Sequence, residues 1–127
     1  MNFEPVIGLE IHVQMKTKSK MFSSSPNGFS HIPNTQITAL DMGYPGAMPV
    51  VNKQAVINDI RVANALHMTI DHTLYFDRKN YFYADLPKGF QITQQYRPIG
   101  KEGYLTITMP DGSKKNIGID SINMEED

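Results

Sequence analysis

YLTITMPDGSKKNIGIDSINM, residues 104–124, predicts a β-hairpin. Two strand-like runs, 104–109 and 116–124, contain alternating apolar and polar residues over 105–109 and 116–120, which is the period-two pattern of half-buried strands. The two runs are joined through a turn at residues 110–113, Pro-Asp-Gly-Ser. Asp-Gly is typical of tight turns because glycine adopts a positive φ without steric cost. The last third of the chain is therefore expected to form two antiparallel strands.

One helix and several shorter strands are predicted before the hairpin. Asn52 is a good N-cap, and Val56, Ile60 and Ala63 recur at i, i+4 and i+7, so we expect a helix over about 53–67. Its outer side should carry Arg61 and Asn64. Residues rich in β-branched and aromatic side chains predict strands at 73–76, 81–83 and 90–94, with a loop at 85–89.

A further strand is predicted at residues 7–15, where every odd position is apolar. Because side chains on a strand alternate between faces, the odd positions should face the core, and Glu10 and His12 should point together from the other face. A carboxylate beside an imidazole on a rigid strand is a candidate cation or acid–base site. The alternative is that both residues simply occupy the solvated face of a half-buried strand.

These elements predict an α+β fold that is mainly antiparallel sheet with one helix. The length of 127 residues suits one domain, and 40% hydrophobic with 20% charged residues is ordinary globular usage. A fixed turn is expected at 43–49, which contains two Gly and two Pro. No apolar run approaches the length of a membrane span, and residues 1–7 lack the pattern of a signal peptide.

Cysteine usage and charge limit the kinds of site. The chain has no Cys, which excludes disulfides and thiolate metal sites and favours a cytoplasmic setting. The formal net charge of −1 is not typical of a dedicated nucleic-acid-binding protein. His31, His67 and His72 have no zinc-binding spacing and are expected in loops or on the surface. Neither a Walker loop nor GxGxxG occurs.

Two further clusters could serve a phosphorylated substrate. Arg78 and Lys79 could bind phosphate while Tyr81 contacts a substrate, although the same residues also suit a polar turn before a core strand. Near the C-terminal end, Glu125 and Glu126 could supply the carboxylates that Mg²⁺ prefers. Strand alternation points these two side chains in opposite directions, so only one of them can join a site on a single face.

Five blocks of this chain resemble the B subunit of the tRNA-dependent aspartyl/glutamyl amidotransferases (GatCAB), the GatB/GatE family. The most specific is FDRKNYFY at 76–83, followed by LPKG at 86–89. The others, in order along the chain, are IGLEIHV (7–13), YPGAMPVVN (44–52), QITQ with PIG (91–94 and 98–100) and MEED (124–127). The resemblance covers almost the whole chain.

The resemblance implies a carbon–nitrogen ligase that repairs misacylated tRNA. In that family ATP phosphorylates the side-chain carboxylate of Glu or Asp on the wrong tRNA, and ammonia released from glutamine by the A subunit displaces the phosphate. The C subunit clasps the other two. The reaction site lies in a cradle domain similar to glutamine synthetase and guanidino kinases. Neither the sequence nor the resemblance distinguishes Glu-tRNA from Asp-tRNA as the substrate.

The resemblance also assigns ligands. Its magnesium ligands correspond to Glu10, His12 and Glu125, and Arg78, Lys79 and Tyr81 are our choice for the contacts to phosphate and to the acyl group or nucleotide. Many members hold a structural zinc through four cysteines, but Ser23, Ser25, Thr38 and Asp41 stand at those positions here. No zinc is therefore expected, and we expect Pro, Gly and packing to hold that loop. Ala84 stands where Pro is commoner.

From the resemblance, we expect residues 1–127 to correspond to the amino-terminal part of the family's catalytic (cradle) domain, without its helical and tail domains. We therefore expect this piece to be inactive by itself. The alternative is a non-catalytic module that docks partner subunits or tRNA, and the discriminating feature is whether a divalent cation binds at Glu10, His12 and Glu125.

Overall fold

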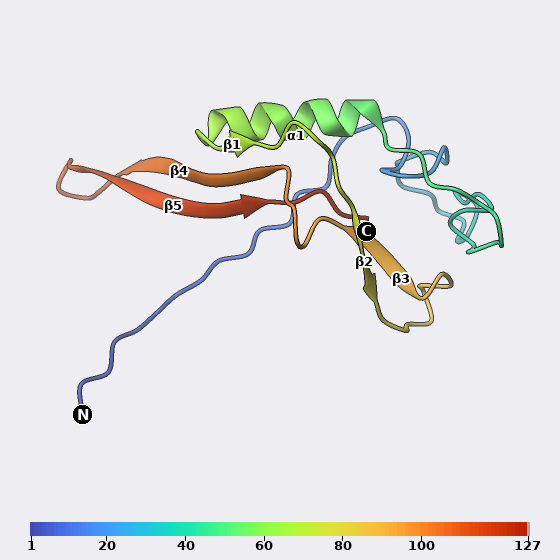
Figure 1. Cartoon of the computed structure of the whole chain (residues 1–127), viewed down its shortest axis with the longest axis horizontal. Coiled ribbons are helices and arrows are strands. Elements are labelled where there is room, and N and C mark those ends of the chain that lie inside the picture. The colour runs from blue at the N-terminus through green and yellow to red at the C-terminus, as the bar shows by residue number, and fades with distance from the viewer. Residues whose placement is uncertain (127) are drawn as a thin grey trace.

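The computed structural model describes residues 1–126 and consists of one helix and two antiparallel sheets. Helix α1 (Lys53–Ala65) lies along a three-stranded sheet with the order β1-β4-β5 (Figure 1). A second sheet pairs β2 with β3 and projects in another direction. The α+β class predicted from the sequence is confirmed. The strands are β1 (Thr69–Ile70), β2 (Asp77–Asn80), β3 (Phe90–Thr93), β4 (Gly100–Thr108) and β5 (Lys114–Ile122).

The predicted hairpin is formed by β4 and β5, which pair from Gly100↔Ile122 to Thr108↔Lys114. Gly112 has a φ of +83°, as the Asp-Gly turn requires. The Met109 N–H donates to the Ser113 carbonyl at 2.8 Å and closes the turn. The sequence pattern therefore locates this hairpin correctly.

Helix α1 begins at the predicted N-cap and ends two residues before the predicted end. Asn52 Oδ1 accepts the Gln54 N–H at 2.9 Å, which satisfies one of the free amides at the start of the helix. The chain leaves the helix through His67, whose φ is +56°. Arg61 and Asn64 are exposed, as expected.

Two glycines of β4, Gly100 and Gly103, allow the end of the helix and the sheet to approach closely. A Cβ at Gly103 would lie 2.5 Å from the Leu66 carbonyl oxygen and 2.4 Å from Met68 Cγ. Such distances require the backbone to shift, so only glycine fits here. Ala63 and Met68 are buried beside this junction, and Ala55, Ile99 and Met124 form the core cluster.

The predicted strand at residues 7–15 is wrong. The segment is extended but unpaired and runs away from the body of the molecule (Figure 1). Its apolar residues Ile7, Leu9, Ile11 and Val13 are 79% to 86% exposed instead of facing a core. A strand needs a partner for its backbone groups and a surface for its apolar face, and within residues 1–126 no other segment pairs with this one. The chain joins the body at Met15, whose carbonyl accepts from Asn27 Nδ2 at 2.8 Å.

The strands predicted at 73–76 and 81–83 are also wrong. The paired residues are the polar Asp77–Asn80, for which the sequence suggests a turn, in the register Asp77↔Thr93 to Asn80↔Phe90. Asp77–Asn80 pair with β3, a strand that is predicted nearly correctly, whereas the neighbouring aromatic segments are unpaired. Phe76 instead packs edge-on against Phe22, with ring centroids 5.2 Å apart, and Phe82 is 90% exposed.

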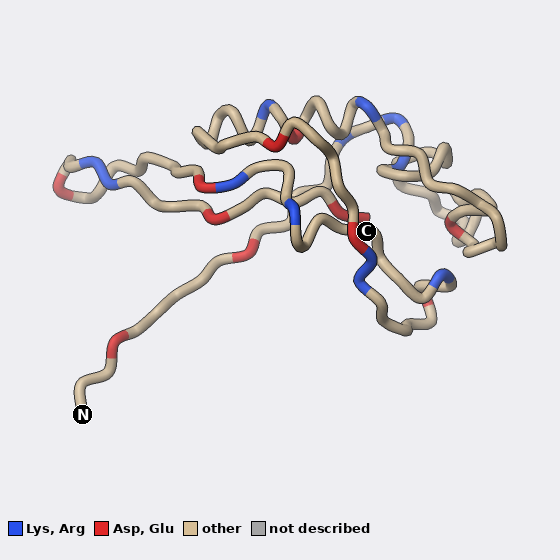
Figure 2. The backbone as a smooth tube through the Cα atoms, in the orientation of Figure 1, with Lys and Arg blue, Asp and Glu red and all other residues tan. Residues whose placement is uncertain are grey.

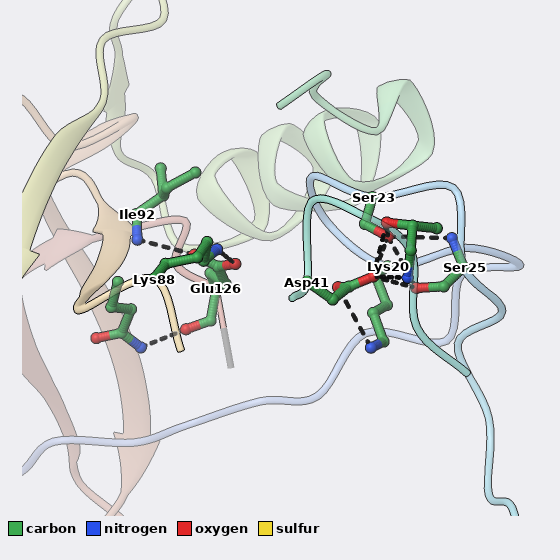
Figure 3. A network of polar contacts seen from close by, with 9 residues as sticks. Lys20, Ser23, Ser25, Asp41, Lys88, Ile92 and Glu126 are labelled. Atoms are coloured by element: carbon green, nitrogen blue, oxygen red, sulfur yellow. Dashed lines mark hydrogen bonds and ion pairs between the residues drawn. The ribbon is translucent and has the colours of Figure 1, made fainter. Parts of the chain in front are cut away.

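The loop region before the helix is held by a hydrogen-bond network around Asp41 (Figure 3). Asp41 Oδ2 accepts from the Thr38 N–H at 2.7 Å, the Thr38 hydroxyl at 2.9 Å, Ser23 Oγ at 2.8 Å and Ser25 Oγ at 3.2 Å. Our expectation that Pro, Gly and packing hold this loop is therefore incomplete. The fixed turn that follows is confirmed, with positive φ at Gly43 and Gly46.

No helix in the described part of the chain is long and apolar enough to span a bilayer.

Candidate functional site

Two carboxylates and one imidazole from opposite ends of the chain meet near the body of the molecule. His12 Nε2 lies 3.5 Å from Glu10 Oε1, and His12 Nδ1 lies 3.5 Å from Glu125 Oε1. The three side chains are 70%, 90% and 32% exposed for His12, Glu10 and Glu125. The structure therefore brings together the three residues that the sequence singled out, although 113 positions separate His12 from Glu125.

The three groups form a row with the imidazole in the middle. Each ring nitrogen faces a different carboxylate, so the carboxylates lie on different sides of the ring. Carboxylate oxygen and imidazole nitrogen are suitable donors for a divalent cation. Within residues 1–126, however, no three such side chains converge in a geometry that could hold a metal ion. The donor types fit a cation, whereas binding would require the exposed Glu10 and His12 side chains to rotate toward a common point.

Glu126 is engaged elsewhere, which separates its role from that of Glu125. Its carboxylate pairs with Lys88, and Glu126 Oε2 accepts the Ile92 N–H at 3.1 Å (Figure 3). Glu125 is thus the carboxylate of the pair that faces His12. The prediction that the two side chains point in different directions agrees with these separate partners.

Arg78 and Lys79 lie on β2 and contact different aromatic rings. The Arg78 guanidinium lies 4.3 Å from the centroid of the Phe90 ring, and Lys79 Nζ lies 5.7 Å from the centroid of Tyr81. Consecutive residues of a strand face opposite sides, so these cations are presented to different surfaces. No hydrogen bond or ion pair among residues 1–126 connects them to the row of Glu10, His12 and Glu125. Figure 2 shows acidic and basic residues next to one another on β2, whose sequence is Asp-Arg-Lys-Asn.

The remaining histidines are exposed, as the sequence predicted. His67 stacks on Tyr104 with ring centroids 4.4 Å apart, and His31 contacts Phe29 edge-on at 4.9 Å.

The sequence reasoning missed several polar contacts that the structure shows. Asp71 and Arg97 form an ion pair with Arg97 Nη2 at 3.0 Å from Asp71 Oδ1, and the hydrogen bond from Arg97 lowers the pKa of Asp71. Gln91 and Gln94 bind the backbone of the segment that carries Glu125. The QITQ block contains both glutamines, but only the tertiary structure reveals their partners.

Comparison with known proteins identifies the family. The sequence profile of the GatB/GatE catalytic domain matches residues 5–127. The chain therefore belongs to the GatB/GatE catalytic-domain family.

Relatives within this family are close in sequence. The B subunit of the aspartyl/glutamyl-tRNA(Asn/Gln) amidotransferase of Mycoplasmopsis pulmonis is 59% identical over 126 residues. The proteins of the same name from Mesoplasma florum and Geobacillus thermodenitrificans are each 56% identical, over 126 and 127 residues. These matches cover 99% to 100% of this chain, and the chain spans 26% of the length of each relative.

Proposed function

We propose that this chain is the amino-terminal part of the catalytic domain of a tRNA-dependent amidotransferase. The complete enzyme would convert Glu-tRNA(Gln), Asp-tRNA(Asn) or both into the correctly amidated tRNA in the cytoplasm. ATP would activate the side-chain carboxylate as an acyl-phosphate, and ammonia from glutamine would displace the phosphate. The A and C subunits and the misacylated tRNA would be the partners, and the domain would adopt the glutamine synthetase-like cradle.

The observation that carries this proposal is the row of Glu10, His12 and Glu125 in a chain of this family. Phosphoryl transfer depends on electrostatic stabilisation and positioning more than on covalent chemistry by the protein. Glu10, His12 and Glu125 would hold Mg²⁺, which neutralises charge on the phosphates when it is bound. The exposure of Glu10 and His12 leaves both side chains free to reorient around a cation.

Arg78, Lys79 and Tyr81 would serve the substrates. Arg78 and Lys79 are exposed cations on one short strand, which suits contacts with phosphate oxygens, and Tyr81 lies directly after the end of that strand. Because their side chains face different sides of β2, we expect only one of the two cations to contact a given phosphate group.

Cation binding by the chain itself tests the proposed site. Mn²⁺ is titrated into the parent chain and into Glu10→Gln, His12→Gln and Glu125→Gln, and free Mn²⁺ is measured by electron paramagnetic resonance. We expect each substitution to weaken Mn²⁺ binding by ~10-fold or more, because even residues that only orient metal ligands change affinity by ~10–100-fold. Glu4→Gln, in the same exposed segment, is the matched control and should bind like the parent.

A parent chain that binds no Mn²⁺ at millimolar concentration would favour the second candidate function, a docking module for partner subunits or tRNA. The observation behind that candidate is the row of exposed apolar residues Ile7, Leu9, Ile11 and Val13. Contiguous exposed apolar surface is typical of interaction sites.

A further inference from the structure

The chain after β5 lies beside β3 and is fastened there by a few specific hydrogen bonds. The Glu126 N–H donates to the Ile92 carbonyl at 2.9 Å, and the Met124 N–H donates to Gln94 Oε1 at 3.0 Å. The Gln94 side chain is fully buried, and its Nε2 donates to the Tyr75 carbonyl at 3.0 Å. Gln94 thus connects the backbone before Glu125 to the segment that precedes β2.

Lys88 fixes the other side of Glu125 through an ion pair with Glu126. The Lys88 side chain is only 6% exposed, and a buried ammonium requires a charged or polar partner. The second oxygen of the Glu126 carboxylate accepts the Ile92 N–H, and Gln91 Nε2 donates to the Glu126 carbonyl. Both the side chain and the backbone of Glu126 are therefore held.

Lys88 is itself held by the turn that follows the Asp41 network. A Cβ at Gly43 would lie 3.2 Å from both the backbone nitrogen and the Cα of Lys88, so the turn packs directly on its backbone. Asp41 and Glu126 also border the same small cavity of about 40 Å³. The two polar clusters are thus neighbours in space (Figure 3).

We propose that Lys88 and Gln94 are positioning residues that hold Glu125 against His12. They act through the backbone of Met124 and through Glu126, the residues on either side of Glu125 in sequence. This inference rests on the proposed function, because it assigns both residues to the same candidate cation site. It also gives the LPKG and QITQ blocks a shared role, the docking of residues 124–126.

Two variants with matched controls test this role in the full 127-residue chain. Lys88→Met removes the cation and keeps an apolar side chain of similar length, and Gln94→Met removes both polar groups of the glutamine. The controls are Lys114→Met, on the exposed part of the hairpin, and Gln95→Met, an exposed neighbour of Gln94. Amide hydrogen exchange at Met124 and Glu126, without metal, reports directly on docking of the segment. Mn²⁺ titration by electron paramagnetic resonance reports on the candidate site.

We expect faster exchange at Met124 and Glu126 and Mn²⁺ binding weakened by ~10–100-fold in both variants, with parental values in both controls. Circular dichroism identifies any variant that fails to fold. If Gln94→Met does not fold, the exchange and Mn²⁺ data of Lys88→Met decide whether the positioning role holds. Unchanged exchange, or faster exchange with unchanged Mn²⁺ affinity, would overturn the positioning role. If Glu125→Gln leaves Mn²⁺ binding intact, the proposed cation site itself fails, whatever the exchange data show.

Discussion

Asp41 and Asp59 are two carboxylates largely removed from water, yet their pKa values move in opposite directions. Burial by itself would raise the pKa of Asp41, but hydrogen bonds from Thr38 and Ser23, with the nearby Lys20 ammonium, outweigh it and lower the pKa from 3.8 to about 2. Burial raises the pKa of Asp59 to about 6. Asp59 Oδ2 has no hydrogen-bond partner among the described residues.

The difference shows that hydrogen-bond donors, and not burial, decide whether an ionised carboxylate stabilises the folded protein. Asp41 lies in a loop whose amide and hydroxyl groups can turn toward it. Asp59 lies on the inner face of α1 between Ala55 and Ala63, one helical turn away on either side, and those neighbours offer no donor. The hydrogen bonds in the loop therefore favour the ionised form of Asp41, whereas burial in the helix favours the protonated form of Asp59, each relative to the same group in water.

The largest effect is expected from Asp41→Ala. The change leaves the Thr38 N–H and three hydroxyl groups without their acceptor, so the free energy of unfolding should fall by about 3 to 5 kcal/mol. Since the folded pKa is lowered, the stabilisation by Asp41 is present above pH 3.8 and is lost as the pH falls through about 2. Urea denaturation at several pH values measures both effects. Asp85→Ala, at an exposed turn, is the control, and equal losses in the two variants would contradict the central role of Asp41.

The second effect, of opposite sign, is expected from Asp59→Asn. A carboxyl group whose folded pKa is raised from 3.8 to about 6 stabilises the protein below pH 3.8, and this contribution is lost as the pH rises through 6. The asparagine variant should therefore be more stable than the parent by about 2 to 3 kcal/mol at pH 8, at 1.36 kcal/mol per pKa unit. The advantage should vanish below pH 4.

Thermal or urea unfolding of Asp59→Asn across this pH range gives the comparison, with the exposed Asp120→Asn as the control. A constant difference between variant and parent at all pH values would show that Asp59 is not the titrating group.

A smaller loss is expected from Ser23→Ala. The Ser23 hydroxyl donates to Asp41 and accepts the Ser25 N–H at 3.1 Å, so its removal should cost about 1 to 2 kcal/mol. Ser24→Ala changes an exposed neighbour and should be close to neutral. Urea midpoints of the two variants distinguish a specific network from a general preference for serine in this loop.

The smallest effect is expected from Lys20→Met. Lys20 Nζ lies 3.4 Å from Asp41 Oδ1, but the lysine side chain is partly exposed, and such ion pairs contribute about 0 to 1 kcal/mol. The loss should be lower still at about 0.5 M NaCl, which screens the pair. A loss larger than that of Ser23→Ala would mean that charge, and not hydrogen bonding, compensates the burial of Asp41.

Local sequence patterns correctly predicted the helix and the hairpin, whose hydrogen-bond partners lie within the same stretch of sequence. The β4–β5 hairpin and α1 are encoded in contiguous residues, because a turn joins the two strands and a helix closes its hydrogen bonds internally. The same reasoning failed for residues 7–15 and for the segments on either side of β2, since the alternation of apolar residues does not show which strand will pair with them.

The candidate site likewise has some features that the sequence predicted and others that only the structure shows. The types and spacing of Glu10 and His12, and the choice of Glu125, came from the sequence and from the resemblance that it carries. The partners of Glu126, the buried role of Gln94 and the bond from Ser23 to Asp41 could not be predicted, because each depends on groups 18 to 38 residues away in the chain.

The sequence by itself determined the helix and the hairpin, and its resemblance to the GatB/GatE family named Glu10, His12 and Glu125 as candidate ligands. The helix and the hairpin follow from residue types and short-range periodicity, which are properties of adjacent residues, whereas the candidate ligands follow from the resemblance. Only the tertiary structure decided that Glu125, and not Glu126, faces His12, and that one aspartate is stabilised while the other is not. The physical reason is that hydrogen-bond donors, charges and pairing edges act over a few ångströms in space, and folding determines which distant residues come within that reach.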